Sequence, residues 1–276
     1  MSGLLGIVRP SGPVDLAAAA SMLRVMDARG PDARRAETLG ENAFLGVTAR
    51  GDAGPAWDRE RRWCVAVDGE WTSLGAIRKE LAARDELADE GPAGVAATLF
   101  AELGFERGME RLRGDAAVLA WDATERRLWA ARDRTGTRPL LHATLRDGTV
   151  IVASEARAIL RHPKADGKLD ADALARLVVL GFLAPPHTPW ASVRKLGPGC
   201  LARVDRDGLA ELVYWREGAN PAGAAGARYR WARSAGYAVE LAVGQRAQGE
   251  IAVARSGGAY ATAIAGAVAG GGRGAA

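Results

Sequence analysis

The sequence contains little cysteine: only Cys64 and Cys200 occur in 276 residues. No CxxC spacing and no cluster of cysteine and histidine is present, so neither a disulfide framework nor a zinc site of ordinary spacing is expected. There is also no run of about 18 apolar residues, which excludes a transmembrane helix by hydropathy. The first ten residues lack a charged region followed by a long apolar one, so they do not read as a signal peptide. We therefore expect a cytoplasmic protein without a membrane partner.

Dense clusters of one charge are missing as well. The 37 Lys and Arg residues and 33 Asp and Glu residues give a formal net charge of +4. The two signs are interleaved, as in residues 57–63 (Trp-Asp-Arg-Glu-Arg-Arg-Trp), and no basic stripe spaced by aromatic residues appears. The three histidines share no metal or triad spacing. These patterns argue against nucleic-acid binding and against a resident metal.

Strand and helix signals alternate along the first 215 residues. Apolar or alternating runs predict strands over residues 3–8, 43–48, 63–67, 116–121, 127–131, 140–145, 150–153, 201–204 and 212–215. Capping residues and apolar periodicity predict helices over residues 15–28, 73–83, 92–104, 155–160 and 171–180. Strands in runs, broken by a few helices, indicate an α+β domain of packed antiparallel sheets with helices outside.

The composition changes after Trp215. Residues 216–228 are rich in Ala and Gly and are typical of a linker. A helix-like segment (230–247) and an apolar run (251–254) follow, and the chain finishes in a Gly-rich tail. We predict a domain over residues 2–215, a linker over 216–228 and a short second segment over 229–276.

Seven segments resemble, in order, the class II glutamine amidotransferase domain of the asparagine synthetase family. They are residues 1–8, 28–32 (Ala-Arg-Gly-Pro-Asp), 67–71 (Val-Asp-Gly-Glu-Trp), 112–122, 132–141, 152–160 and 193–199. The resemblance implies a four-layer αββα sandwich of the N-terminal-nucleophile-hydrolase type. It also implies that residues 229–276 are a remnant of the start of a synthetase domain.

The resemblance places the nucleophile at Ser2, where the family has cysteine. In the family the α-amino group of this residue, exposed when methionine is removed, accepts the proton of the nucleophile; such a group has a pKa of about 7.7–8.0. A serine hydroxyl can attack an amide by the same route, but it is a poorer nucleophile than a partly ionised thiol.

The family's oxyanion-binding Asn-Gly pair corresponds to Asp68 and Gly69. An ionised aspartate only accepts hydrogen bonds, so it opposes the negative charge that develops during attack. Loss of one oxyanion donor costs roughly 100–1,000-fold in rate. The alternative interpretation, which we favour from the sequence alone, is that the pair forms a simple turn.

The groups that hold the α-carboxylate and α-ammonium of glutamine also differ. Pro92 occupies the position of the family's aspartate, and Ala49 that of its arginine. Arg50 is one residue away, where a strand would direct it to the opposite face, so it is expected to be a surface residue.

The second segment resembles the ATP-binding loop of the family's synthetase domain. Ser256, Gly257 and Gly258 match the start of that loop, whereas Tyr260 replaces its aspartate. One β-α unit cannot form the parallel sheet that holds a nucleotide. No cofactor is therefore expected, and ATP and Mg²⁺ enter only if a complete synthetase domain is supplied elsewhere.

The leading hypothesis is a catalytically impaired glutamine amidotransferase-like protein with a structural or regulatory role. Its expected partner is a second copy, as a homodimer, or a separate amide-forming synthetase chain. Two alternatives remain open: an N-terminal-serine amidohydrolase acting on an amide other than glutamine, and a divergent glutamine-hydrolysing asparagine synthetase.

Overall fold

The structure is a computed structural model that describes residues 1–217, 237–239 and 242–243. The chain divides into two compact units, Met1–Arg216 and Glu217–Ala276. Only the first is described in detail below. Most of the predicted second segment lies outside the described residues. This applies to the linker from residue 218 onward, to most of the helix predicted over residues 230–247, to the apolar run 251–254, and to Ser256, Gly257 and Gly258.

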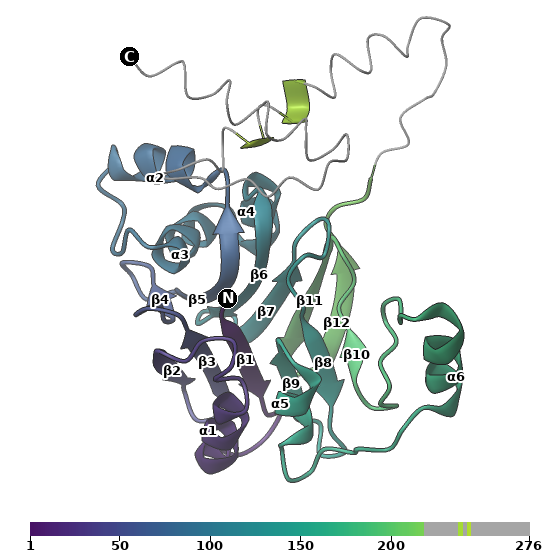
Figure 1. The fold of residues 1–276 in the computed structure, drawn as a ribbon. Coiled ribbons are helices and arrows are strands. Elements are labelled where there is room, and N and C mark those ends of the chain that lie inside the picture. Colours follow the sequence, from purple (N-terminus) through teal and green to yellow (C-terminus); the bar gives the residue numbers. More distant parts are fainter. Residues whose placement is uncertain (218–236, 240–241, 244–276) are drawn as a thin grey trace, which may run out of the picture. The chain divides into compact units, whose positions relative to one another are not determined.

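Two antiparallel sheets form the centre of this unit (Figure 1). The first has the order β10-β8-β9-β1-β3-β2. Its strands are β1 (Gly3–Val8), β2 (Ala33–Leu39), β3 (Ala43–Ala49), β8 (Leu141–Thr144), β9 (Val150–Ala153) and β10 (Arg194–Lys195). The second has the order β12-β11-β7-β6-β5-β4. Its strands are β4 (Ala56–Trp57), β5 (Trp63–Trp71), β6 (Gly114–Asp122), β7 (Arg127–Arg132), β11 (Cys200–Asp205) and β12 (Gly208–Val213).

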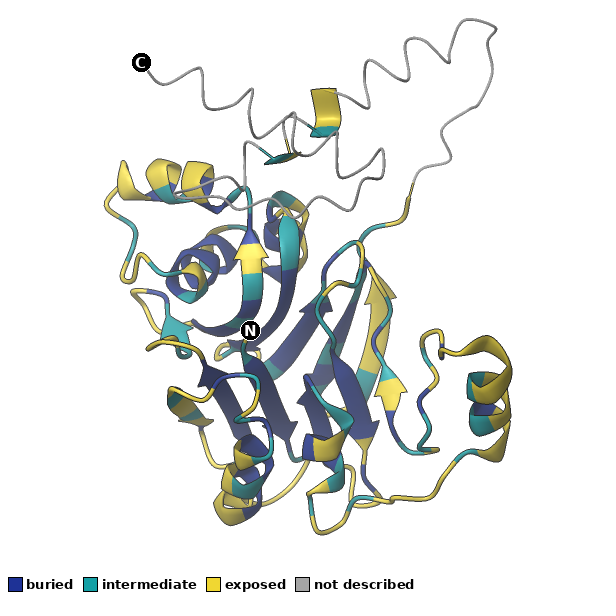
Figure 2. Cartoon of the chain, in the orientation of Figure 1, coloured by how far each residue is buried: buried dark blue, intermediate teal, exposed yellow. Residues whose placement is uncertain are grey.

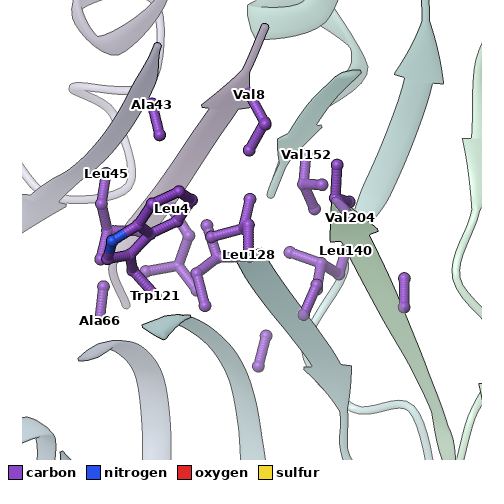
Figure 3. Packing of buried hydrophobic residues seen from close by; sticks show 14 of the residues in the cluster. Leu4, Val8, Ala43, Leu45, Ala66, Trp121, Leu128, Leu140, Val152 and Val204 are labelled. Atoms are coloured by element: carbon purple, nitrogen blue, oxygen red, sulfur yellow. The ribbon is translucent and has the colours of Figure 1, made fainter. Parts of the chain in front are cut away.

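The sheets stack face to face because their strands alternate in side-chain direction. Leu4 and Val8 of β1 join Trp121 of β6 in one buried cluster between the sheets (Figure 3). Leu119 of β6 belongs to the same cluster. Leu5, the neighbour of Leu4, belongs instead to the cluster on the outer face of the first sheet. Successive side chains of a strand point to opposite faces of the sheet, so the same strand contributes apolar residues both to the core between the sheets and to the outer face.

Helices cover both outer faces, and Figure 2 shows the buried strands between them. On the first sheet lie α1 (Leu16–Arg24) and α5 (Ala156–Leu160). On the second lie α2 (Leu74–Ala82), α3 (Pro92–Leu103) and α4 (Phe105–Arg111). A further helix, α6 (Ala171–Leu180), buries only Ala173. The predicted four-layer αββα arrangement is confirmed.

Several predicted boundaries follow local chemistry. The Asp15 side chain accepts a hydrogen bond from the Ala18 N–H at 2.9 Å and begins α1, although that helix ends at Arg24 rather than near residue 28. Pro92 is the first residue of α3. Gly181 ends α6 in a left-handed conformation, with φ +74°. Ser73 does not cap α2 through its side chain; its hydroxyl accepts from the Arg113 N–H at 2.9 Å.

The sequence did not predict β2, β4, α4 or the two-residue strand β10. β2 is an edge strand whose polar side chains are largely exposed, so it lacks the apolar alternation that identifies a strand. β4 has only two residues, and α4 only seven. All four depend on neighbouring elements rather than on their own sequence pattern.

One side-chain contact joins β8 of the first sheet to β12, the edge strand of the second. His142 of β8 is buried, and its Nε2 lies 3.1 Å from Glu211 Oε1 of β12. Burial lowers the pKa of His142 below its ordinary value, although the Glu211 carboxylate opposes that shift. The folded protein therefore takes up this proton less readily than the unfolded chain does.

This difference predicts a pH-dependent stability. As the pH falls below the ordinary histidine pKa of about 6.5, the unfolded chain binds the proton first, so the free energy of unfolding should decrease. The contribution of one proton is at most about 1.4 kcal/mol per pH unit. His142→Gln keeps a hydrogen-bonding side chain but does not titrate. Urea unfolding between pH 7 and 5 should therefore show a shallower loss of stability in this variant, and identical slopes would contradict the assignment.

Candidate functional site

A cleft of about 490 Å³ opens beside the N-terminal residue of β1. Ser2 lines it, together with Val67 and Gly69 of β5 and Pro92 at the start of α3. The structure therefore brings together four positions that the sequence analysis selected or flanked. The wall is completed by residues of β2 and of the segment between β3 and β4.

Ser2 lies where the chain enters the first sheet. Met1 is 69% exposed, whereas Gly3 and Leu4 are already buried. The backbone N–H of Ser2 donates to Asp68 Oδ1 at 2.7 Å. The atom that becomes the α-amino nitrogen on removal of Met1 is therefore in direct contact with a carboxylate.

Asp68 is fully buried. It continues the row formed by Cys64 and Ala66, which face the space between the sheets. Its carboxylate points at the Ser2 nitrogen, and the cleft wall is formed by Val67 and Gly69 instead. Asp68 and Gly69 lie inside β5, so the interpretation of this pair as a simple turn is wrong. Pairing with β6 over the full strand outweighs the turn propensity of the two residues.

The guanidinium of Arg29 compensates the buried Asp68 carboxylate. Its Nη2 donates to Asp68 Oδ2 at 2.7 Å, and its Nε donates to the Ser2 carbonyl at 2.7 Å. Its Nη1 lies 3.9 Å from Glu155 Oε1. Arg138 Nη1 lies 3.9 Å from the other Asp68 oxygen. A buried carboxylate needs such partners because desolvation of an unpaired charge costs several kcal/mol.

The residues that follow Arg29 explain how it reaches the site. A Cβ at Gly30 would lie 2.4 Å from the Ala49 backbone nitrogen, so only glycine permits this approach to β3. The Asp32 carboxylate accepts from the Gly51 N–H at 2.8 Å and fixes the other end of the segment. The Arg-Gly-Pro-Asp sequence therefore positions the Arg29 guanidinium next to Ser2 and Asp68.

Gly69 has a comparable steric constraint. Its φ is +127°, and a Cβ there would lie 2.0 Å from the Asp115 carbonyl oxygen of β6. Only glycine fits at this point of the strand pair.

The structure also locates the expected ligand anchors. Pro92 lines the cleft but carries no charge. Arg50 is exposed and does not line the cleft, and Ala49 is buried. Neither position supplies a guanidinium to the site.

Four charged side chains that the sequence analysis did not select line the cleft: Arg35, Glu37, Asp52 and Asp89. Arg35 and Asp52 form an ion pair, and Asp89 Oδ1 accepts from the Gly91 N–H at 2.7 Å. No motif marked them, because they come from an edge strand and two loops that meet only in three dimensions. The cleft thus contains one guanidinium and three carboxylates.

Among the residues that the structure describes, no group of three or more His, Cys, Asp and Glu side chains could hold a metal ion. None of the described helices is long and apolar enough to cross a membrane.

Comparison with known proteins gives the following matches. The family model for the glutamine amidotransferase domain matches residues 1–215. A putative glutamine-hydrolysing asparagine synthetase of Mycobacterium tuberculosis (strain ATCC 25618 / H37Rv) is 39% identical over 108 residues, 38% of this chain and 16% of that protein. Asparagine synthetase 3 of Bacillus subtilis (strain 168) is 28% identical over 155 residues, 55% of this chain and 25% of that protein. The chain thus spans at most a quarter of the length of these two relatives.

Amidase chyE of Penicillium rubens is 29% identical over 139 residues, 48% of this chain and 20% of that protein. Among solved structures, the glutamine phosphoribosylpyrophosphate amidotransferase of B. subtilis superposes with a TM-score of 0.56 at 15% identity. That match covers 78% of this chain and 50% of the other. It establishes a shared fold.

Removing Arg29 should destabilise the protein because it leaves the Asp68 carboxylate buried without its main partner. We expect Arg29→Met to lower the free energy of unfolding by about 3–5 kcal/mol, measured by urea denaturation. Arg34→Met is the matched control: Arg34 also pairs with an aspartate, at 2.8 Å, but its side chain is 52% exposed against 13% for Arg29. The control should lose at most about 1 kcal/mol. Equal losses in the two variants would show that burial of the pair contributes nothing.

Proposed function

The chain belongs to the glutamine amidotransferase domain family, with asparagine synthetases among its relatives, and on that premise we propose that its N-terminal site is impaired in glutamine hydrolysis. In this proposal the protein keeps the αββα scaffold for a structural or regulatory role. A single observation carries it: the Asp68 carboxylate accepts from the Ser2 nitrogen at 2.7 Å.

The first consequence of this contact concerns the α-amino group, which serves as the catalytic base. Glutamine hydrolysis in this family requires a neutral α-amino group to take the proton of the nucleophile. While Met1 remains, the Ser2 nitrogen is a peptide N–H and cannot accept a proton. After removal of Met1 it would be an amine 2.7 Å from a carboxylate, where the opposite charge favours the protonated ammonium. An ammonium cannot act as the base.

The same residue also weakens oxyanion stabilisation. Both oxygens of the Asp68 carboxylate are engaged, one by Ser2 and one by Arg29, and an ionised aspartate side chain has no N–H to donate. The family's asparagine would offer an amide donor at this position.

A second candidate is supported by the open cleft itself. Ser2 lines it beside Arg35 and Asp89, which together can pair with a carboxylate and an ammonium. An N-terminal-serine amidohydrolase acting on an amide other than glutamine would use this cleft, provided that its α-amino group loses a proton despite the Asp68 contact, and one relative carries the name amidase. Its activity would require a free α-amino group, so an added N-terminal tag should abolish it.

A glutamine-hydrolysing asparagine synthetase activity is the third candidate. The relatives with that name are at least four times as long as the segment they share with this chain. ATP and Mg²⁺ would bind to a synthetase domain supplied elsewhere. The two free thiols are consistent with the cytoplasmic location that we propose.

An exposed apolar surface supports the proposal that the protein binds a partner chain. Val178, Val179 and Leu180 of α6 and the nearby Phe182 are 59–85% exposed. Contiguous apolar surface of this kind marks interaction sites. The proposed partners are a second copy of the chain or a separate synthetase chain.

Restoring two of the family's residues should raise the rate of glutamine hydrolysis, although Ala49 and Pro92 still leave the α-groups of glutamine without the family's anchors. We expect Ser2→Cys alone to release little ammonia from glutamine, because Asp68 still holds the amine and offers no donor. Ser2→Cys with Asp68→Asn should be faster by about 100-fold or more, since one oxyanion donor contributes that much. Ammonia release is measured directly, and intact mass verifies removal of Met1.

The control combines Ser2→Cys with Asp58→Asn. Asp58 is also buried, but its Oδ1 accepts from the Trp63 N–H at 2.6 Å and it does not line the cleft. This variant should remain slow. The proposal is wrong if the unmodified protein already hydrolyses glutamine as fast as the restored double variant.

Val179→Glu tests the interaction surface. If the purified protein is a dimer through α6, a charge at this position should dissociate it, as measured by sedimentation or light scattering. Leu16→Glu is the control, because Leu16 is also exposed but lies on α1. A dimer that survives Val179→Glu would exclude α6 as the dimer surface, and a monomeric wild type would leave a synthetase chain as the partner to be tested.

A further inference from the structure

A second cleft, of about 440 Å³, lies where turns from both sheets converge. It is lined by Arg9 after β1, Asn42 before β3, residues Thr124–Arg127 between β6 and β7, and residues Asp205–Asp207 between β11 and β12. The β1, β3, β6–β7 and β11–β12 segments are not adjacent in sequence. Hairpin turns projecting from a rigid pair of sheets are a common location for binding residues.

Each of the three carboxylates that line this cleft forms an ion pair with a different arginine. Glu125 lies 2.9 Å from Arg127. Asp205 lies 3.0 Å from Arg203. Asp207 lies 3.9 Å from Arg206. The three negative charges are therefore compensated without Arg9 or Arg126.

Arg9 and Arg126 bind neutral oxygens instead. Arg9 donates to the Pro13 carbonyl, and Arg126 Nη2 donates to Asn42 Oδ1 at 3.0 Å. Within residues 1–217 neither arginine forms an ion pair with a carboxylate. Both arginines line the cleft, and neither has a carboxylate as its hydrogen-bond partner.

Asn42 connects the segments that carry these two arginines. Its Nδ2 donates to the Arg9 carbonyl at 3.0 Å while its Oδ1 accepts from Arg126. The turn that presents Arg126 is also unusual, because Arg126 adopts a left-handed conformation with φ +53°. Residues other than glycine rarely adopt that conformation, which is stabilised here by the surrounding contacts.

We infer that this cleft binds a small phosphate-bearing anion between Arg9 and Arg126. Planar guanidinium groups each donate two parallel hydrogen bonds to phosphate oxygens. The volume exceeds that of a single phosphate group, so a phosphomonoester with a small organic part fits the site.

This site is separate from the cleft at Ser2. β1 runs from Gly3 to Val8, so Ser2 and Arg9 lie at its opposite ends. Six strand residues span about 20 Å. The inference does not rest on the proposed function, and a ligand at one cleft leaves the other free.

Isothermal titration with inorganic phosphate and with pyrophosphate, at low and constant ionic strength, tests the inference. The wild-type protein should bind both saturably. The double variant Arg9→Gln with Arg126→Gln should bind at least about tenfold more weakly, since each hydrogen bond to a charged group contributes that much or more. Arg107→Gln is the control: it removes one exposed arginine from α4, which does not line this cleft. It should bind as the wild type does.

Hydrogen exchange on the wild-type protein provides a second measurement that is independent of the folding of the variants. Phosphate should slow exchange at the turns containing Arg126 and Arg206. Absence of saturable binding, equal weakening by Arg107→Gln, or protection only around Ser2 and Asp89 would each overturn the inference.

Discussion

The contact of the Arg29 guanidinium with Asp68 and Ser2 is the interaction on which the rest of the site depends. Asp68 belongs to β5 of one sheet and Ser2 precedes β1 of the other, so this contact links the two sheets where the chain begins. The buried carboxylate is tolerated only because a guanidinium and a backbone N–H satisfy both of its oxygens. The same satisfaction removes it from any catalytic use. The same contacts therefore stabilise the fold at this position and underlie the impairment that we propose.

The αββα sandwich itself does not require a reactive N-terminus. Its three apolar clusters lie between and outside the sheets and include no residue of the cleft that carries a charge. Replacement of an oxyanion donor by an acceptor can therefore leave the fold intact while it changes the chemistry. This separation of scaffold from site is why family membership establishes the architecture here and leaves the activity as a proposal.

Sequence reasoning predicted the features that depend on local chemistry. The β1, β3 and β9 strands follow from apolar runs, and α1, α3 and α6 from Asp15, Pro92 and Gly181. It did not predict the role of Arg29, because Ser2 and Asp68 are 27 and 39 residues away and nothing local indicates their convergence. Arg35 and Asp89 were missed for the same reason. The Asp68-Gly69 pair has the local pattern of a turn, and only its pairing with β6 makes it part of a strand.

The two clefts differ in the charge that they present. Every residue of β1 is buried, so the strand offers no exposed side chain along its length, and polar groups gather only at its ends. At the Ser2 end three carboxylates face one guanidinium, whereas at the Arg9 end the guanidiniums exceed the carboxylates. Opposite charge balances favour opposite ligands: groups with ammonium character at the first cleft and phosphate at the second. The stiffness of the sheet keeps these two environments apart, so each can change in evolution without the other.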